Sequence, residues 1–361
     1  MDGVEQVRAR VTVQEWPAWR LRYGFQWNDQ QAGEGDQSVR LPGETAGRQQ
    51  SLGVVADLQS QNLFGHAIST GLFGLLESDL RTARTYVAFP SLFRLPVTTN
   101  VYLFAEREEV NAAQQLSFVT DRKGVSAEQR WRRTRTTQVS WSYRFERNHT
   151  YDPAASPDDD FALDVKFDIA RFGVTSVIDR RDDPFDTRRG WFSSVAFEYA
   201  APGIGSDLRM AKLYAQQKFF RPVGPVVLAA MVQAGTAFAD ALIPSERFYA
   251  GGGYTVRGYA ENSLGPVDFL GLPRGGDTLL VMNQEVRVPV YKWARAIAFF
   301  DAGNVFRTRD EVSFRNLKVG YGLGLRIDTP FALLRLDYGI PASRGAGESR
   351  GWWYFGIGHV F

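Results

Sequence analysis

One arginine in the sequence stands among residue types that could hold a buried charge. Arg257 lies in the stretch FYAGGGYTVRGY, residues 248–259, and two acidic residues follow it, Glu285 in TLLVMNQEVRVPV and Asp301 in AFFDAGNVF. A guanidinium stays charged at any working pH, so an arginine inside a protein requires carboxylate partners and several hydrogen-bond acceptors. The chemistry available to these three residues is ion pairing, which would fasten one segment of the chain to another. An ordinary surface arginine in a loop is the alternative interpretation.

No other set of residues in the sequence indicates catalysis or metal binding. The histidines His66, His149 and His359 are scattered and cysteine is absent, so the spacing favours neither a metal cluster nor a Ser-His-Asp triad. The acidic stretch SVIDRRDDPFDTRRGW, residues 176–191, could attract Ca²⁺, but its interleaved arginines favour a self-neutralised turn. We therefore expect no catalytic residue, no metal and no cofactor.

Composition excludes two broad classes of protein. The 42 basic and 40 acidic residues leave a formal charge of +2, without the basic excess that nucleic-acid binders usually show. No apolar run approaches the roughly 18 residues of a membrane-spanning helix. Hydrophobic residues nevertheless make up 44% of the 361 residues, so the apolar side chains must be arranged in another pattern.

That pattern is an alternation with a period of two. In residues 19–27, WRLRYGFQW, the odd positions are large and apolar, while the even positions are Arg, Gly or Gln. The same period recurs in TTQVSWSYRFE, LKVGYGLGLRID and ALLRLDYG, and it predicts β-strands with one apolar and one polar face. Because the apolar faces are rich in aromatics and the polar faces mix both charges with glycine, we expect the apolar faces to meet lipid and the polar faces to line a lumen.

The alternation and the connections together predict a transmembrane antiparallel β-barrel of about sixteen strands in residues 17–361. Long connections, among them 108–121 and 237–276, alternate with short turns, and long loops at one end of an even strand count are typical of outer-membrane barrels. Glu285 and Asp301 fall on the lumen-facing parity of two consecutive strands. Residues 1–16 differ in pattern and resemble the last strand of a small preceding domain. The sixteen expected strands are 18–27, 50–60, 65–77, 80–89, 99–107, 122–132, 135–147, 161–172, 190–200, 207–220, 225–236, 277–290, 293–303, 315–328, 331–339 and 351–361.

The motifs resemble, in their order along the chain, those of the outer membrane protein 85 superfamily of BamA/TamA-type assembly factors and two-partner-secretion relatives. FYAGGGYTVRGY is similar to the superfamily's long sixth loop, and TLLVMNQEVRVPV and AFFDAGNVF are similar to the strands that follow. The closing YFGIGHVF resembles the C-terminal β-signal, in which Tyr354, Gly356 and Phe361 fit, whereas His359 stands where a hydrophobic residue is usual. By the same resemblance, residues 1–16 are the end of a periplasmic POTRA domain.

The resemblance implies a position for the arginine and its neighbours. Loop 6 would be re-entrant, folding back into the barrel with Arg257, Gly258 and Tyr259 at its tip, where the arginine would contact Glu285 and Asp301. Glycines tolerate the backbone angles that such a path requires. Those placed for it are Gly251, Gly252 and Gly253.

The resemblance also implies a function without covalent chemistry. The chain would assemble proteins in the bacterial outer membrane at a weak seam between the first and last strands, where unpaired backbone groups can template an incoming strand. Its partners would be the lipid bilayer, unfolded outer-membrane proteins and periplasmic or lipoprotein subunits. The alternatives are a polypeptide translocation pore of the two-partner-secretion type and a plain outer-membrane diffusion channel. Neither a diffusion channel nor a hydrolase would need the loop motif. The glycines that would weaken the seam are Gly24, Gly356 and Gly358.

Overall fold

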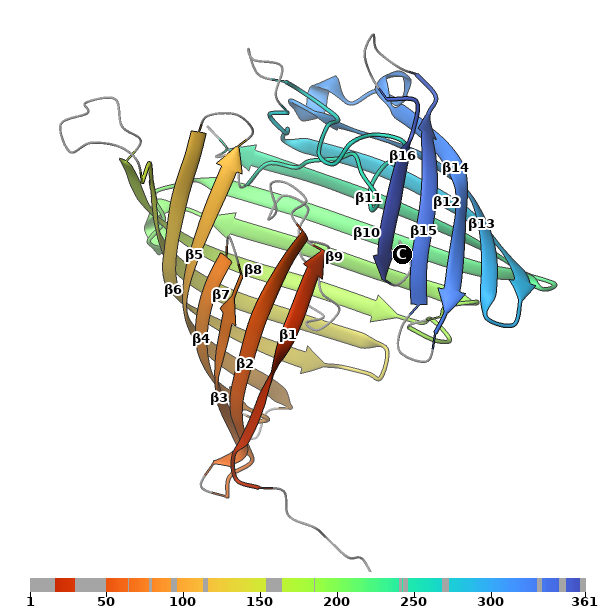
Figure 1. Cartoon of the computed structure of the whole chain (residues 1–361). Coiled ribbons are helices and arrows are strands. Elements are labelled where there is room, and N and C mark those ends of the chain that lie inside the picture. Colours follow the sequence, from red (N-terminus) through yellow and green to blue (C-terminus); the bar gives the residue numbers. More distant parts are fainter. Residues whose placement is uncertain are drawn as a thin grey trace, which may run out of the picture.

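Sixteen strands in one sheet form the whole architecture of this computed structural model (Figure 1). The structure describes residues 17–29, 50–63, 65–77, 80–91, 96–112, 116–153, 164–184, 186–239, 242, 246–267, 273–329, 333–343 and 349–357. In chain order the strands are β1 (Arg20–Asp29), β2 (Gln50–Leu63), β3 (Ile68–Leu76), β4 (Leu80–Phe89), β5 (Val97–Ala112), β6 (Leu116–Arg132), β7 (Thr137–Tyr151), β8 (Asp164–Asp179), β9 (Gly190–Ala200), β10 (Met210–Val223), β11 (Val226–Ala239), β12 (Thr278–Tyr291), β13 (Ala294–Phe306), β14 (Lys318–Asp328), β15 (Leu333–Pro341) and β16 (Trp352–Ile357).

Short helical turns occur only between strands in the described ranges. They are the 3₁₀ helices η1 (Pro202–Ile204), η3 (Arg309–Glu311) and η4 (Phe314–Asn316). No helix in these ranges has the length and apolar character to cross a membrane.

Every strand pairs antiparallel with its neighbours in the chain, so the spatial order equals the sequence order. This is the arrangement that hairpin connections produce, because a short turn can join only antiparallel neighbours. The sheet curves along its length, with β1 and β16 as its two edges (Figure 1). In the parts of β1 and β16 that the structure describes, no ladder joins the two strands to each other.

The two faces of the sheet differ as the period-two pattern predicts. On β14, Leu323 is 70% exposed, whereas Arg326 on the opposite face is fully buried. On β15, Leu336 is exposed while the charged Arg335 and Asp337 are buried. The sheet therefore turns its large apolar side chains outward and its charges inward, which is the reverse of a water-soluble protein and typical of a barrel that faces lipid.

The predicted strands all exist, but several are longer than expected. The long connection predicted at 108–121 is wrong, because β5 continues to Ala112 and β6 begins at Leu116. The apolar alternation fades there, yet the ladder continues, and the Arg122 guanidinium lies 2.7 Å from the Glu108 carboxylate across the strands. Cross-strand ion pairs of this kind support a strand without any hydrophobic signal. The segment 1–16, predicted to end a preceding domain, lies outside the described residues.

A charge on the exposed apolar face should destabilise the protein in a bilayer. We expect Leu323→Arg, near the middle of β14, to cost about 2–4 kcal/mol of unfolding free energy in lipid vesicles, because a charge at the bilayer midplane must be desolvated. The measurement is a denaturant titration followed by tryptophan fluorescence. Phe314→Arg is the matched control, since Phe314 is equally exposed but lies in η4 beyond the strand ends. Equal stability of the two variants would contradict the assignment of this face to lipid.

Candidate functional site

The segment between β11 and β12 packs against the buried face of the sheet. Phe248, Ala250 and Val256 in this segment are fully buried. They share one hydrophobic cluster with strand residues that include Val281 on β12 and Val305 on β13. Apolar contact therefore holds the segment against the strands, and the charged residues are placed within that packing.

Glycines let the segment turn and approach the strands closely. Gly251 and Gly252 have φ angles of 107° and 97°, and the Thr255 hydroxyl accepts a hydrogen bond from the Gly251 N–H at 2.8 Å. Gly258 has a φ angle of 103°, and a Cβ there would lie 2.8 Å from the backbone carbon of Ile340 on β15. Positive φ and close backbone approach both favour glycine, so the conformation explains the glycine content of this stretch.

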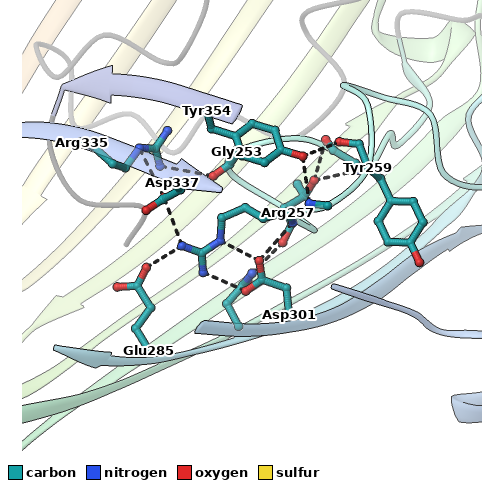
Figure 2. Close-up of polar contacts among 12 residues, drawn as sticks. Gly253, Arg257, Tyr259, Glu285, Asp301, Arg335, Asp337 and Tyr354 are labelled. Atoms are coloured by element: carbon teal, nitrogen blue, oxygen red, sulfur yellow. Dashed lines mark hydrogen bonds and ion pairs between the residues drawn. The ribbon is translucent and has the colours of Figure 1, made fainter. Parts of the chain in front are cut away.

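Arg257 lies at the centre of a buried group of carboxylates (Figure 2). Its Nε and Nη2 donate to the two carboxylate oxygens of Asp301 at 2.7 and 2.9 Å, and its backbone N–H donates to the same group at 3.0 Å. Its Nη1 donates to Glu285 at 2.8 Å and to Asp337 at 3.3 Å. The guanidinium also stacks on Phe299, with Cζ 3.5 Å from the ring centre. Paired, charge-assisted bonds of this geometry are the strong ones.

The carboxylates keep the arginine charged in spite of its burial. Burial alone disfavours the charged form, but Asp301, Glu285 and Asp337 outweigh it and raise the pKa of the Arg257 guanidinium above its ordinary value. Breaking such a network by removing one partner is costly, because the opposite charge stays buried. The segment is thus fixed by electrostatics as well as by packing.

Three further arginines complete the network. Arg287 donates to Glu285 at 2.9 Å and Arg326 lies 2.5 Å from Asp337. Arg335 instead donates to the Gly253 carbonyl at 3.2 Å and stacks 4.2 Å from the centre of the Tyr254 ring. Its Nε also lies 4.0 Å from Asp337, so Arg335 joins the group of carboxylates to the segment.

A tyrosine of the last strand joins the segment to the edge of the sheet. The Tyr354 hydroxyl accepts a hydrogen bond from the Gly258 N–H at 2.9 Å and donates one to the Tyr259 carbonyl at 2.7 Å (Figure 2). The Tyr259 hydroxyl in turn donates to the Val319 carbonyl on β14 at 3.1 Å. The tip of the segment is therefore bonded to β16 as well as to the interior strands.

The structure brings some of the sequence-predicted residues together and separates others. Arg257, Glu285 and Asp301 lie in contact, with Gly258 and Tyr259 beside Tyr354. Gly24 lies on β1 at the opposite edge of the sheet, with open space at its Cβ position. Gly356 lies on β16 opposite Arg335, and a Cβ there would lie 3.0 Å from that guanidinium. The remaining predicted residues, Gly358 and Phe361, lie outside the described residues.

Sequence reasoning did not assign Asp337 or Tyr354 to the contacts of Arg257. The signal for Asp337 was its parity, since it follows the exposed Leu336 on β15 and is buried, as Glu285 is. No signal indicated Tyr354, because its role depends on a hydroxyl that meets the backbone of a distant segment.

The acidic turn after β8 is neutralised by neighbouring groups. The Asp182 carboxylate accepts backbone N–H bonds from Arg188 and Arg189 at 3.0 and 3.1 Å, and Arg181 pairs with Asp179 at 2.8 Å. Across the described ranges, no three His, Cys, Asp or Glu side chains are placed to hold a metal ion.

The strands expose their apolar faces, and buried ion pairs hold the segment between β11 and β12 against their polar faces. These two features together define a β-barrel protein of an outer membrane. Residues 62–361 match the Omp85 superfamily domain, and the chain belongs to the Omp85 superfamily. This family is non-enzymatic.

Two curated relatives come from different compartments. The chain is 29% identical over 240 residues to the outer membrane protein assembly factor BamA of Nitratidesulfovibrio vulgaris, covering 62% of this chain and 30% of the relative. It is 32% identical over 127 residues to the chloroplastic outer envelope protein 39 of Arabidopsis thaliana, covering 33% of this chain and 32% of the relative. The chain thus spans about a third of the length of these relatives.

Solved structures show the same fold. BamA from Haemophilus ducreyi lacking POTRA domains 1–3 superposes with a TM-score of 0.74 at 16% identity, over 84% of this chain and 66% of that one. CdiB from Escherichia coli gives a TM-score of 0.58 at 13% identity, over 96% of this chain and 63% of that one. The sixteen antiparallel strands therefore match the BamA barrel.

Removing the arginine should destabilise the protein. We expect Arg257→Ala to lower the unfolding free energy by about 3–5 kcal/mol, because Asp301 would stay buried without a cation. Arg257→Lys should recover only part of this, since an ammonium cannot make the paired contact. Arg315→Ala, an exposed arginine in η4, is the control. Denaturant unfolding of all three checks the prediction, and an unchanged Arg257→Ala variant would contradict it.

The bond between the last strand and the segment can be tested by removing one oxygen. Tyr354→Phe leaves the ring in place but deprives the Gly258 N–H and the Tyr259 carbonyl of their partner, so we expect a loss of about 1–3 kcal/mol. Tyr321→Phe, on the exposed face of β14, is the matched control and should be neutral. If both variants unfold at the same denaturant concentration as the parent, the hydroxyl contributes nothing.

Proposed function

We propose that this chain is the membrane domain of a BamA-type assembly factor, which inserts other outer-membrane proteins at the seam between β1 and β16. The observation that carries the proposal is that the described residues of these edge strands pair only with β2 and β15. An unpaired strand edge presents free backbone donors and acceptors that can bind an incoming strand. The likeness to two BamA proteins supports the proposal.

The edge strands suit temporary pairing. Over the described residues, the β15–β16 ladder joins Leu334–Gly339 to Trp352–Ile357, and Gly356 lies within it. Gly24 occupies the middle of β1, opposite Val55 of β2. A glycine inside a strand removes side-chain packing and weakens the strand, which would help an edge to exchange partners. We propose the same role for Gly358 and for the closing Phe361.

The contacts of Tyr354 give the segment between β11 and β12 a part in this function. The Arg257, Gly258 and Tyr259 tip would hold β16 in position through the Tyr354 hydroxyl, while Glu285 and Asp301 hold the tip. Gly251 and Gly252 would provide the turn that brings the tip there. We propose that the tip re-enters a closed barrel when the two edges meet.

The proposed setting follows from this function. The partners would be the lipid bilayer, unfolded outer-membrane proteins as clients, and periplasmic or lipoprotein subunits. We propose the outer membrane of a bacterium as the location, with residues 1–16 as the end of a POTRA domain.

A translocation pore of the two-partner-secretion type is the second candidate. The observation that favours it is the placement of the segment between β11 and β12 on the polar, buried face of the strands, where it would obstruct a passage until it moved. In that case a client would cross along the polar face, without pairing with a strand edge.

Cysteine cross-linking during insertion separates the two candidates. The chain has no cysteine, so engineered ones are unique. With the full chain in liposomes and an unfolded outer-membrane protein carrying one cysteine in its last strand, we expect faster insertion than in empty liposomes. We also expect a disulfide to Tyr23→Cys on the edge strand β1.

Two control positions make the result specific. Phe197→Cys on β9 is exposed on the same apolar face but far from either edge, and should not cross-link. Ser126→Cys lies on the polar parity of β6 and reports passage along that face. Cross-links at Ser126→Cys without any at Tyr23→Cys would favour the pore. If the chain did not accelerate insertion, the proposed assembly function would be wrong.

A further inference from the structure

A second buried ion pair holds the segment between β11 and β12 at a different place. Here the segment carries the negative charge, whereas at Arg257 it carries the positive charge. Glu246 lies before Phe248 in the segment and is only 4% exposed. Its Oε1 lies 3.0 Å from Nη2 of Arg171 on β8, and its Oε2 lies 3.6 Å from Nζ of Lys212 on β10. At this place the segment supplies the carboxylate and the strands supply the cations, whereas at Arg257 the segment supplies the cation.

Lys212 contacts the segment through its buried ammonium. It is 1% exposed, and its ammonium contacts the Glu246 carboxylate and lies 4.9 Å from the centre of the Phe248 ring. Both contacts come from the segment. An ammonium buried to this degree is costly without a nearby counter-charge, so loss of the Glu246 carboxylate would destabilise the buried Lys212.

Arg171 has other partners and would stay paired without the segment. Its guanidinium lies 2.8 Å from Glu146 and 3.8 Å from Glu198, and Glu146 also pairs with Arg144 at 2.8 Å. On the strands alone, these cations and carboxylates balance one another. The carboxylate that forms an ion pair with Lys212, at 3.6 Å, is that of Glu246.

We propose that Glu246 and Lys212 form a second anchor, which fixes the first part of this segment to β8–β10 while Arg257 fixes its tip to β12–β15. Glu246 is a positioning residue in this proposal, because it acts on the path of the segment. The proposal concerns the resting position of the segment, so it stands whether or not the chain inserts other proteins.

The test measures opening of the segment at a buried cysteine. Ala250→Cys places a thiol at a fully buried position close to Glu246, where a water-soluble maleimide can react only after local opening. In the full-length protein in lipid vesicles, Glu246→Gln should increase the labelling rate at least about tenfold. Lys212→Met should do the same, and the double variant should label no faster than the faster single variant, because both changes remove one shared interaction.

Controls and a second measurement keep the result clear. Glu311→Gln, an exposed acid in η3, should leave labelling unchanged. The gel mobility of unheated protein confirms a folded barrel. If the cysteine variant does not fold, hydrogen exchange at the Phe248 amide, which donates to the Gly276 carbonyl at 2.8 Å, reports the same opening in Glu246→Gln alone. Labelling or exchange within twofold of the parent, or single effects that multiply in the double variant, would overturn the proposal.

Discussion

The burial of one guanidinium sets the constraints that the C-terminal half of the structure satisfies. Arg257 cannot lose its charge, so the strands beneath it must place carboxylates within hydrogen-bonding distance of the guanidinium. Glu285, Asp301 and Asp337 do so from three different strands, because each sits on the buried parity of its own strand. The period-two pattern of β12, β13 and β15 is therefore a requirement of the ion pair as well as of the lipid-facing surface.

Glycine on the strands is the second requirement. A Cβ on Gly320 of β14 or on Gly339 of β15 would collide with the backbone of Arg257. A strand surface of ordinary side chains would hold the tip several ångströms away, and the guanidinium would not reach its partners. Gly320 and Gly339 thus leave room for the segment, at the cost of side-chain packing within the strands.

The sequence predicts the sheet well because its strands are amphipathic, and the alternation that identifies a strand lies within that strand's own residues. Sixteen segments alternate between apolar and polar residues, and all of them form strands in the structure. The long connection predicted at 108–121 is wrong for a related reason, since the alternation ends before β5 and β6 do, and Arg122 and Glu108 continue the pairing by charge. A pattern of hydrophobicity cannot report a strand that ionic contacts support.

The site was predictable in part. Parity along the strands placed Glu285 and Asp301 on the same face, and the motif placed Arg257 nearby, so their meeting followed from sequence. Glu246 carried no such signal, because a single glutamate in a long connection looks like any solvent-exposed acid. Its burial accompanies contacts with Arg171 on β8 and Lys212 on β10, which are tertiary contacts that the neighbouring residues in the sequence do not determine.

The hydroxyl of Tyr354 makes the contacts of an earlier segment depend on a later strand. Its two hydrogen bonds join the tip of the segment to β16, the last strand to be added along the chain. The tip cannot complete its contacts until β16 has docked on β15, although the segment itself precedes β12. Arg257 therefore precedes in the chain one of the groups that fix the tip around it, and the two hydrogen bonds of Tyr354 can form only once β16 is in place.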